Sequence, residues 1–189
     1  MKRMEIPRLE LGQVPAELAT ALRPRVQRLG YLGEFFKCAA HQPAALLSFM
    51  RFTDDLKEAL PDNLTEVVAL TAAGWMGNTY ERNQHERLCR KRGFAADWIR
   101  AVNALQPAAQ AALDENERCV QHLTLAVLNG RGHGVQAQLD AVAGPLGAAK
   151  AMAILLLIGR YVTHALIVNA LELAPPVPSI FDDHQSPSR

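Results

Sequence analysis

The spacing of apolar residues constrains the fold of this chain more than any other feature of its sequence. Almost every long segment places apolar side chains three and four residues apart, which is typical of amphipathic helices. No stretch alternates apolar and polar positions over β-branched residues, as a half-buried strand would. Glycine and proline clusters separate the helical segments. The sequence therefore predicts an all-α protein.

The positions of glycine and proline residues predict where the helices lie and how the chain is organised. An apolar content of 49% in 189 residues is enough for one substantial core. We expect an N-terminal arm and short helix over 1–29, one helical domain over 30–173, and a proline-rich tail over 174–189 that lies loosely on the surface. Within these limits, a first short helix is predicted between Pro15 and Pro24, with a broken continuation to Leu29. Further helices are predicted at 34–40, 43–60, 64–73, 79–92, 96–105, 107–128, 135–142 and 145–173.

Charge and cysteine content exclude several classes of function. Twenty basic residues against nineteen acidic ones give a net charge of +1, so no global field favours nucleic acid or an anionic membrane. The longest uninterrupted apolar run, 151–159, ends at Arg160 and is too short to span a bilayer. The N-terminus does not read as a signal peptide, and the three cysteines form no CxxC pair. We expect a reduced, cytoplasmic chain.

Glu81 and His85 form the first candidate for chemistry. Four residues on a helix correspond to about 40° of rotation, so both side chains face the same way. A carboxylate beside an imidazole can orient it and raise its pKa, which suits general acid–base chemistry near neutral pH. The alternative is structural, because Asn78-x-x-Glu81 also fits a capping box in which Glu81 folds back on the backbone.

Glu66 extends this candidate site. In one straight helix, Glu66 and His85 would lie about 28 Å apart. The stretch from Gly74 to Asn78 is expected to break the helix, and Glu66 and His85 are equally far from the break on either side. An antiparallel helix pair would therefore bring two carboxylates and an imidazole into one buried seam. Asn63-x-x-Glu66 is also a possible capping box, so a structural role for Glu66 stays open.

These residues carry a resemblance to a known family. The segment LPDNLTEVVALTAAGWMGNTYERNQHERLCRKRGF resembles the core motif of the carboxymuconolactone decarboxylase family, in the AhpD-like alkylhydroperoxidase superfamily. FFKCAAHQPAALLSFMRFTDDLKEALP is similar to the segment that precedes this motif, with a His-x-Pro element at His41 to Pro43, and LLLIGRYVTHALIVNALELAPPVP is similar to the closing helix of many members. The resemblance covers roughly residues 30–178 and implies an AhpD-like helical domain.

The sequence departs from this family at the reactive pair. Peroxidase members carry Cys-x-x-Cys on the second helix, where this chain has Asn78 and Glu81. A thiolate is the nucleophile in such chemistry, and neither residue can replace it. Decarboxylase members instead carry Glu-x-x-x-His, as Glu81 to His85 does here. The resemblance thus implies an acid–base site, with His85 as general acid or base, Glu81 as its partner and Glu66 behind them.

Other candidates have simpler interpretations. Cys89 lies one turn after His85, but three ligands from a single helix are a poor metal site, so no metal or cofactor is expected and Cys89 is interpreted as a small core residue. Arg87, Arg90, Lys91 and Arg92 resemble a nucleic-acid patch, but they crowd the end of a helix, where cations complement its carbonyl groups. Whether some of them steer an anionic substrate toward His85 stays open. His122 and His164 are both expected to be hydrogen-bonded core or interface histidines, and whether Tyr161 lines the site is undecided.

The leading expectation is a lyase-like or isomerase-like enzyme that transfers protons on a small anionic or carbonyl-bearing substrate. One alternative is an AhpD-like peroxidase that relies on Cys89 or a partner thiol. Another is a non-catalytic binding or assembly protein with the same fold. The resemblance, together with a last helix that is apolar nearly all round, also implies a homo-oligomer.

Overall fold

The computed structural model describes residues 6–109 and 111–182, and no strand occurs among them, which confirms the all-α prediction. Most of the predicted helices begin and end within a few residues of their expected bounds. The elements are η1 (Leu11–Gln13), α1 (Ala16–Leu29), α2 (Glu34–Ala39), α3 (Pro43–Glu58), α4 (Asp62–Trp75), α5 (Thr79–Lys91), α6 (Ala96–Asn103), η2 (Pro107–Ala109), α7 (Glu115–Gly130), α8 (Gln136–Leu146) and α9 (Ala148–Ala170).

The chain forms two compact units, Met1–Asp54 and Asp55–Arg189, and the division falls inside α3. In the first unit, the ring of Phe35 packs against that of Phe49, with centroids 5.8 Å apart. A ring nitrogen of His41, from the His-x-Pro element, lies 2.8 Å from the carbonyl oxygen of Pro7. The predicted boundary between residues 29 and 30 lies within this unit, and the domain limits 1–29, 30–173 and 174–189 stay predictions.

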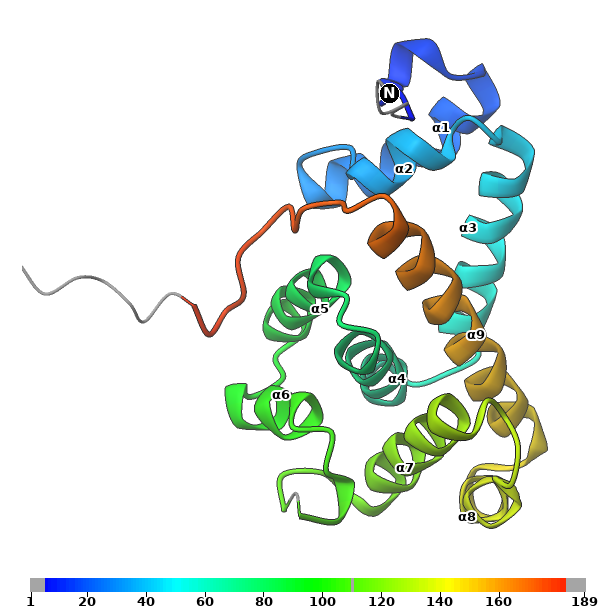
Figure 1. Ribbon diagram of the computed structural model, residues 1–189, viewed down its shortest axis with the longest axis vertical. Coiled ribbons are helices and arrows are strands. Elements are labelled where there is room, and N and C mark those ends of the chain that lie inside the picture. The colour runs from blue at the N-terminus through cyan, green and yellow to red at the C-terminus, as the bar shows by residue number, and fades with distance from the viewer. Residues whose placement is uncertain (1–5, 110, 183–189) are drawn as a thin grey trace, which may run out of the picture. The chain divides into compact units, whose positions relative to one another are not determined.

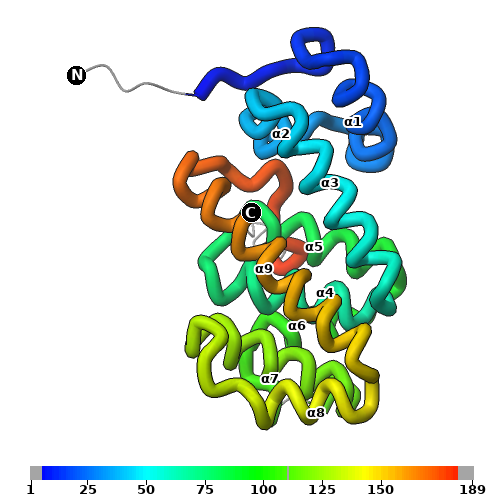
Figure 2. Tube along the Cα trace, turned by 90° about the vertical axis from the view of Figure 1, so that its right-hand side faces the viewer, coloured from blue at the N-terminus to red at the C-terminus, as the bar shows by residue number. Residues whose placement is uncertain are grey.

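The second unit is built around α4. Every residue of this helix from Leu64 to Ala73 is buried, and apart from Glu66 their side chains are small or apolar. Figure 1 shows α4 in the middle of the second unit, where it packs against α5, α6, α7 and α9. In the turned view of Figure 2, α7 and α8 lie beside one another at one end of this unit.

The break between α4 and α5 occurs where the sequence predicts it. Gly77 has a φ of 63°, a left-handed conformation that glycine adopts without steric cost. The side chain of Asn78 then caps α5 by accepting a hydrogen bond from the backbone N–H of Glu81 at 3.1 Å. Arg92, the C-cap residue of α5, forms an ion pair with Asp62, which begins α4. The two helices are therefore antiparallel, as predicted.

Three predicted helices have different bounds in the structure. The helix predicted at 107–128 is split into the short η2 and α7, because Asp114 and Glu117 form a capping box that starts α7 after residue 114. The helices predicted at 135–142 and 145–173 meet at Gly147 instead of Pro145. Pro145 lies inside the last turn of α8, and Gly147 takes a φ of 83° between α8 and α9.

The C-terminal segment is anchored to α5, so the expectation of a loosely attached tail is wrong for the described part. The Ser179 hydroxyl and the Ile180 backbone N–H both donate to the buried carboxylate of Glu86. Asn83 and Arg87 donate to the carbonyl oxygens of Val177 and Pro178. These four bonds come from one face of α5. Residues 183–189 of the predicted tail lie outside the described residues.

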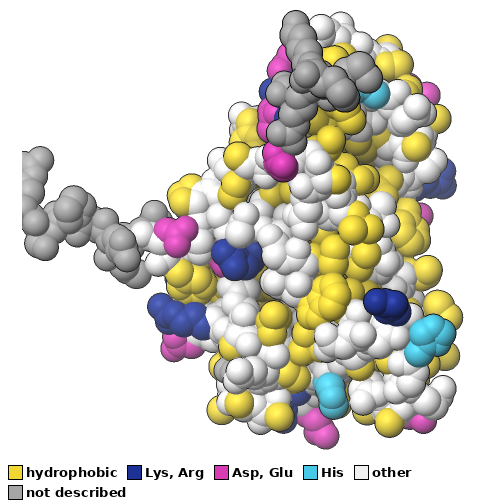
Figure 3. Space-filling view, viewed as in Figure 1, with side chains coloured by type: hydrophobic (Ala, Val, Ile, Leu, Met, Phe, Trp, Pro, Cys, Tyr) yellow, Lys and Arg dark blue, Asp and Glu magenta, His cyan; other side chains and the backbone are white. Residues whose placement is uncertain are grey.

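The long helix α9 has a buried face and an exposed apolar one. Its 23 residues include an 18-residue window with a mean hydropathy of 1.9. By length and composition this helix could cross a membrane, but 56% of the window is buried within the protein. A core helix passes the same test, so this is weak evidence for a span. Met152, Leu156 and Leu166 on the other face are 44–57% exposed. Figure 3 shows charged side chains scattered over the face in view.

Candidate functional site

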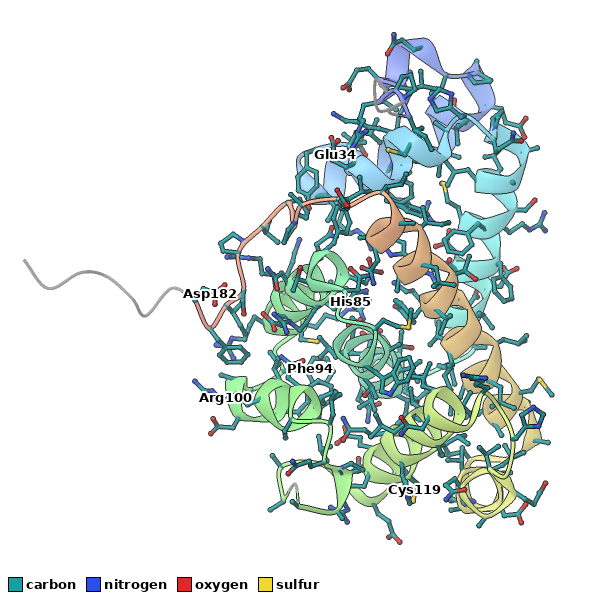
Figure 4. The ribbon with its side chains drawn as sticks, viewed as in Figure 1. Glu34, His85, Phe94, Arg100, Cys119 and Asp182 are labelled. Carbon is teal, nitrogen blue, oxygen red and sulfur yellow. The ribbon has the colours of Figure 1, made fainter. Side chains whose placement is uncertain are left out.

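The antiparallel pair places Glu66 of α4 against His85 of α5. The Nδ1 atom of His85 lies 2.5 Å from Oε2 of Glu66, although the two residues are 19 positions apart in sequence. Both side chains are buried, and the imidazole keeps only 8% of its surface exposed. Figure 4 labels His85 in the region framed by α4, α5 and α9. The contact that the hairpin prediction required is therefore present.

The other oxygen of Glu66 is held by a cation. Arg92 donates to Oε1 of Glu66 at 2.9 Å, and the same guanidinium contacts the exposed Asp62. The prediction that the basic cluster complements the last carbonyl groups of α5 is not met by the bond from Arg90, which goes to the carbonyl oxygen of Phe94 beyond the helix. For Arg92, the prediction missed the contact with Glu66. The Arg92 guanidinium is a positive partner of the buried Glu66 carboxylate, which orients His85.

Glu81 is the second carboxylate beside the imidazole. Its Oε1 atom lies 3.4 Å from Nε2 of His85 and accepts a 3.0 Å hydrogen bond from Arg160 of α9. Its Oε2 atom lies 3.2 Å from Nε2 of His164. The capping-box interpretation of Glu81 is wrong, because the carboxylate reaches across to α9. Only half of that motif, the Asn78 cap, is formed.

The structural alternative for Glu66 also fails. Pro61 occupies the N-cap position of α4, so Asn63 lies inside the helix and cannot start a capping box there. Asn63 instead donates to the carboxylate of Glu117 at 2.9 Å. The carboxylate of Glu66 instead contacts His85 through one oxygen and Arg92 through the other. Both glutamates therefore face the imidazole.

These contacts set the charge states of the three central groups. Burial opposes ionisation of Glu66, but His85, Lys57 and Arg92 together outweigh it and lower the pKa of Glu66. Burial also opposes ionisation of Glu81, and His164, His85 and Arg160 together hold its pKa well below the usual range. Burial alone would lower the pKa of His85, but the two carboxylates raise it. Each buried carboxylate has its own arginine, so a proton on His85 adds positive charge to the cluster.

Helix α9 supplies three residues to the cluster around His85, and the sequence pattern did not place them there. Arg160 and His164 bind Glu81, and the Tyr161 hydroxyl lies 3.4 Å from Nε2 of His85. Arg160 was visible only as the end of an apolar run, and His164 was interpreted as a core histidine. A usable signal exists: Arg160 and His164 lie four residues apart on a helix that is otherwise apolar, and buried charges need a partner of opposite sign.

His164 predicts a loss of stability in mild acid. Burial lowers the pKa of His164 to about 4 from its ordinary 6.5, against the attraction of Glu81 and with the help of Arg160 and His85. Between these two values the unfolded chain binds a proton that the folded chain does not. The free energy of unfolding should therefore fall, by on the order of 3 kcal/mol, as the pH drops from 6.5 to 4. Urea unfolding at several pH values measures this slope.

The other titratable residues of the site change the free energy of unfolding mostly outside the range from pH 4 to pH 6.5. A raised pKa on His85 contributes stability that is fully present below 6.5 and is lost as the pH rises through the folded value. Glu66 and Glu81, whose pKa values are lowered, lose their contribution only as the pH falls below about 4.5. His164→Gln should thus flatten the slope above pH 4.5, whereas the control His122→Gln, at an exposed position of α7, should not. An unchanged slope in His164→Gln would contradict the assignment.

Cys89 lies next to this cluster but is poorly suited to thiol chemistry. Its side chain is fully buried, and its Sγ atom is 3.6 Å from Oε2 of Glu66. Burial, followed by the negative charge of Glu66, raises the pKa of the thiol. Among the described residues, no group of three or more His, Cys, Asp or Glu side chains is arranged to hold a metal ion.

Comparison with solved structures identifies the fold. The chain superposes with a TM-score of 0.77 on a crystal structure described as an alkylhydroperoxidase AhpD core, an uncharacterized peroxidase-related protein from Ralstonia eutropha JMP134. The two sequences are 16% identical, and the match covers 92% of this chain and 91% of that one. A candidate antioxidant defence protein of the AhpD type from Agrobacterium tumefaciens gives a TM-score of 0.67 at 18% identity, covering 74% and 96% of the two chains.

A third solved structure has an enzymatic description. The debrominase Bmp8, in a complex with 2,3,4-tribromopyrrole, superposes with a TM-score of 0.75 at 16% identity, over 90% of this chain and 91% of that one. No family model and no curated protein matches this chain. At these identities the superpositions establish the AhpD-like helical fold, which confirms the resemblance at the level of the fold.

Proposed function

We propose that this protein is an enzyme that transfers protons to or from carbon in a small anionic or carbonyl-bearing substrate, with a decarboxylase-like or isomerase-like reaction. The observation that carries the proposal is the position of His85 between two buried carboxylates, Glu66 and Glu81. Arg92 donates to Glu66 and Arg160 donates to Glu81, and a proton on His85 adds a further positive charge beside them. A site with this balance favours an anionic substrate.

In the decarboxylase form of the proposal, His85 acts as the general acid. The bond between the substrate carbon and its carboxylate breaks, carbon dioxide leaves, and the electron pair stays on the substrate as an enolate. The protonated imidazole then delivers its proton to that carbon. Glu66 orients the ring through Nδ1, and Glu81 stabilises the charged form of the ring beside Nε2. The resemblance to the decarboxylase family supplies a carboxylated lactone as the first substrate class to test.

Deuterium incorporation provides a direct test. Small keto acids and carboxylated unsaturated lactones are incubated with the protein in D₂O, and proton NMR follows loss of substrate and labelling of the carbon. Enzyme-dependent labelling of a carbon adjacent to a carbonyl supports the proposal. If the panel shows no labelling above the buffer rate while the folded protein is intact, acid–base chemistry on this substrate class is contradicted.

A peroxidase function is the second candidate, and the AhpD-type descriptions of two structural neighbours favour it. In this chain the thiol positions hold Asn78 and Glu81, and Cys89 is buried with a raised pKa. These features argue against thiol-dependent peroxide reduction. Reduction of a hydroperoxide that requires added thiol and is abolished by Cys89→Ser would reverse the order of the two candidates.

We also propose that the protein is a homo-oligomer that buries the exposed face of α9. Met152, Leu156 and Leu166 expose 44–57% of their surface at helical spacing, and Gly159 and Thr163 continue the same exposed line. Light scattering should give a mass above that of one chain, and Leu166→Glu should lower it by placing a charge in an apolar interface. Ala148→Glu, at an exposed position in the first turn of α9, is the matched control. A monomeric mass at all concentrations would contradict this interface.

The remaining parts of the proposal concern location and partners. A cytoplasmic location accords with the three free cysteines, Cys38, Cys89 and Cys119. No nucleic-acid or membrane partner is included, because the net charge is near zero and the charged side chains are scattered over the face in Figure 3. No cofactor is invoked for the proton transfer.

A further inference from the structure

The two ring nitrogens of His85 have different partners, and this fixes which of them exchanges a proton. Nδ1 faces Oε2 of Glu66, whose carboxylate also accepts a hydrogen bond from Arg92. An ionised carboxylate is an acceptor only, so Nδ1 keeps its hydrogen in both charge states of the ring. The proton that His85 gains or loses is therefore carried by Nε2.

Nε2 has two neighbours at the same distance. Oε1 of Glu81 and the hydroxyl oxygen of Tyr161 each lie 3.4 Å from it. When Nε2 carries a proton, the Glu81 carboxylate can accept it as a hydrogen bond. When Nε2 is bare, it becomes an acceptor, and the carboxylate offers it no hydrogen. Of these two neighbours, only the Tyr161 hydroxyl can then donate.

We propose that Tyr161 is a positioning residue that supports the proton-free state of His85 by donating its hydroxyl hydrogen to Nε2. This role rests on the proposed function and deepens it, because a general acid must pass through a state in which it has lost its proton. In the reaction, the proton of His85 leaves Nε2 for the substrate carbon. The Tyr161 hydroxyl keeps its own proton and donates a hydrogen bond to the lone pair left on Nε2. Glu81 supports one state of the ring and Tyr161 the other.

The surroundings hold Tyr161 in the form and orientation that this role needs. Its side chain is buried, and its ring meets that of His85 edge to face, with centroids 5.4 Å apart at 81°. The guanidinium of Arg160 covers the ring at 4.4 Å from its centroid. Burial raises the pKa of Tyr161 well above its usual range, so the hydroxyl remains a donor at neutral pH.

Other charged groups of this cluster come from four helices, and α3 contributes Lys57, whose positive charge acts on Glu66 and His164. Glu66 lies on α4, Glu81 and Cys89 lie on α5, Arg92 ends α5, and α9 supplies Arg160 and His164. The sequence alterations used in a test must leave these groups in place. Tyr161→Phe meets that condition, because it removes one oxygen atom and keeps the ring that packs against His85 and Arg160.

The test is an NMR titration of His85 in protein labelled with ¹⁵N-histidine, with the signal assigned by its absence from His85→Gln. Loss of a donor to the neutral ring should raise the pKa of His85 in Tyr161→Phe by about 0.5–1 unit, the equivalent of one ordinary hydrogen bond. Tyr80→Phe is the matched control, since this buried tyrosine of α5 packs against the ring of His164, 6.0 Å away. This control substitution should leave the pKa of His85 unchanged.

The sign of the shift decides the question. If the Tyr161 hydroxyl instead accepts a hydrogen bond from the protonated ring, Tyr161→Phe will lower the pKa of His85, and the proposal is overturned. An unchanged pKa overturns it as well. Site-specific 3-fluorotyrosine at position 161 is a second variant that retains the hydroxyl and makes it a stronger donor, so it should lower the pKa. None of these measurements needs a substrate, so they can fail independently of the proposed enzymatic activity.

Discussion

His85→Gln should reduce the rate of enzyme-dependent deuterium labelling by about 10²- to 10⁴-fold while leaving the fold intact. Glutamine has a similar length and keeps a polar group within reach of Glu66 and Glu81, so the buried seam stays filled. It cannot carry a proton near neutral pH. The protein should therefore lose its proton chemistry before its packing. Initial rates on the most active substrate of the panel, with circular dichroism as the folding check, measure this effect.

The control for this experiment is His122→Gln, the same substitution at an exposed position on α7. It should change neither the rate nor the melting temperature appreciably. A structural His85 gives the opposite pattern. The rate would then stay near that of the unaltered protein, and the substitution would mainly reduce stability, by roughly 1–3 kcal/mol for a buried hydrogen-bonding group. That pattern would remove His85 from the proposed mechanism.

Glu81→Gln should have the largest effect on stability, a loss of about 3–5 kcal/mol in the free energy of unfolding. The Glu81 carboxylate is the 3.0 Å partner of Arg160, and the guanidinium and the carboxylate keep only 9% and 8% of their side-chain surface exposed. Removing the negative charge breaks this buried ion pair and takes the Glu81 charge away from the guanidinium. Urea unfolding at pH 7 measures the change.

A double-mutant cycle separates the ion pair from general damage to the core. Arg160→Met keeps the apolar part of the arginine side chain and removes its charge. The combined Glu81→Gln and Arg160→Met variant should be less destabilised than the sum of the two single variants. Glu58→Gln, at an exposed position of α3, serves as the control for loss of a carboxylate. Strictly additive losses would show that Glu81 and Arg160 are not coupled.

The hairpin half of the site could be predicted because its determinants are local in sequence. Gly77 and the cap at Asn78 specify the break, and the similar spacing of Glu66 and His85 on either side brings them level, whereas Gly74 remains inside α4. The contribution of α9 could not be predicted in this way. Arg160 is 79 positions from Glu81, and no periodicity within either helix specifies which face of α9 packs against α5.

The errors in helix bounds have a similar origin. A 3.6-residue apolar pattern continues through 107–128, but the Asp114 and Glu117 capping box satisfies the first N–H groups of a helix that starts after it. The tail was expected to be loose because proline-rich composition rarely packs. Its anchor is Glu86, a buried carboxylate of α5 that the sequence pattern does not distinguish from a solvated one.

The attachment of the C-terminal segment to Glu86 has a consequence for how this sequence can change over evolution. One face of α5 holds Glu81 and His85 against α4 and α9, and another holds residues 177–180 through Asn83, Glu86 and Arg87. Only Thr79, Arg90 and Lys91 of this helix are exposed. Substitutions should therefore accumulate at those three positions among close homologues, and a change on the tail-binding face should be accompanied by a compensating change in 177–180.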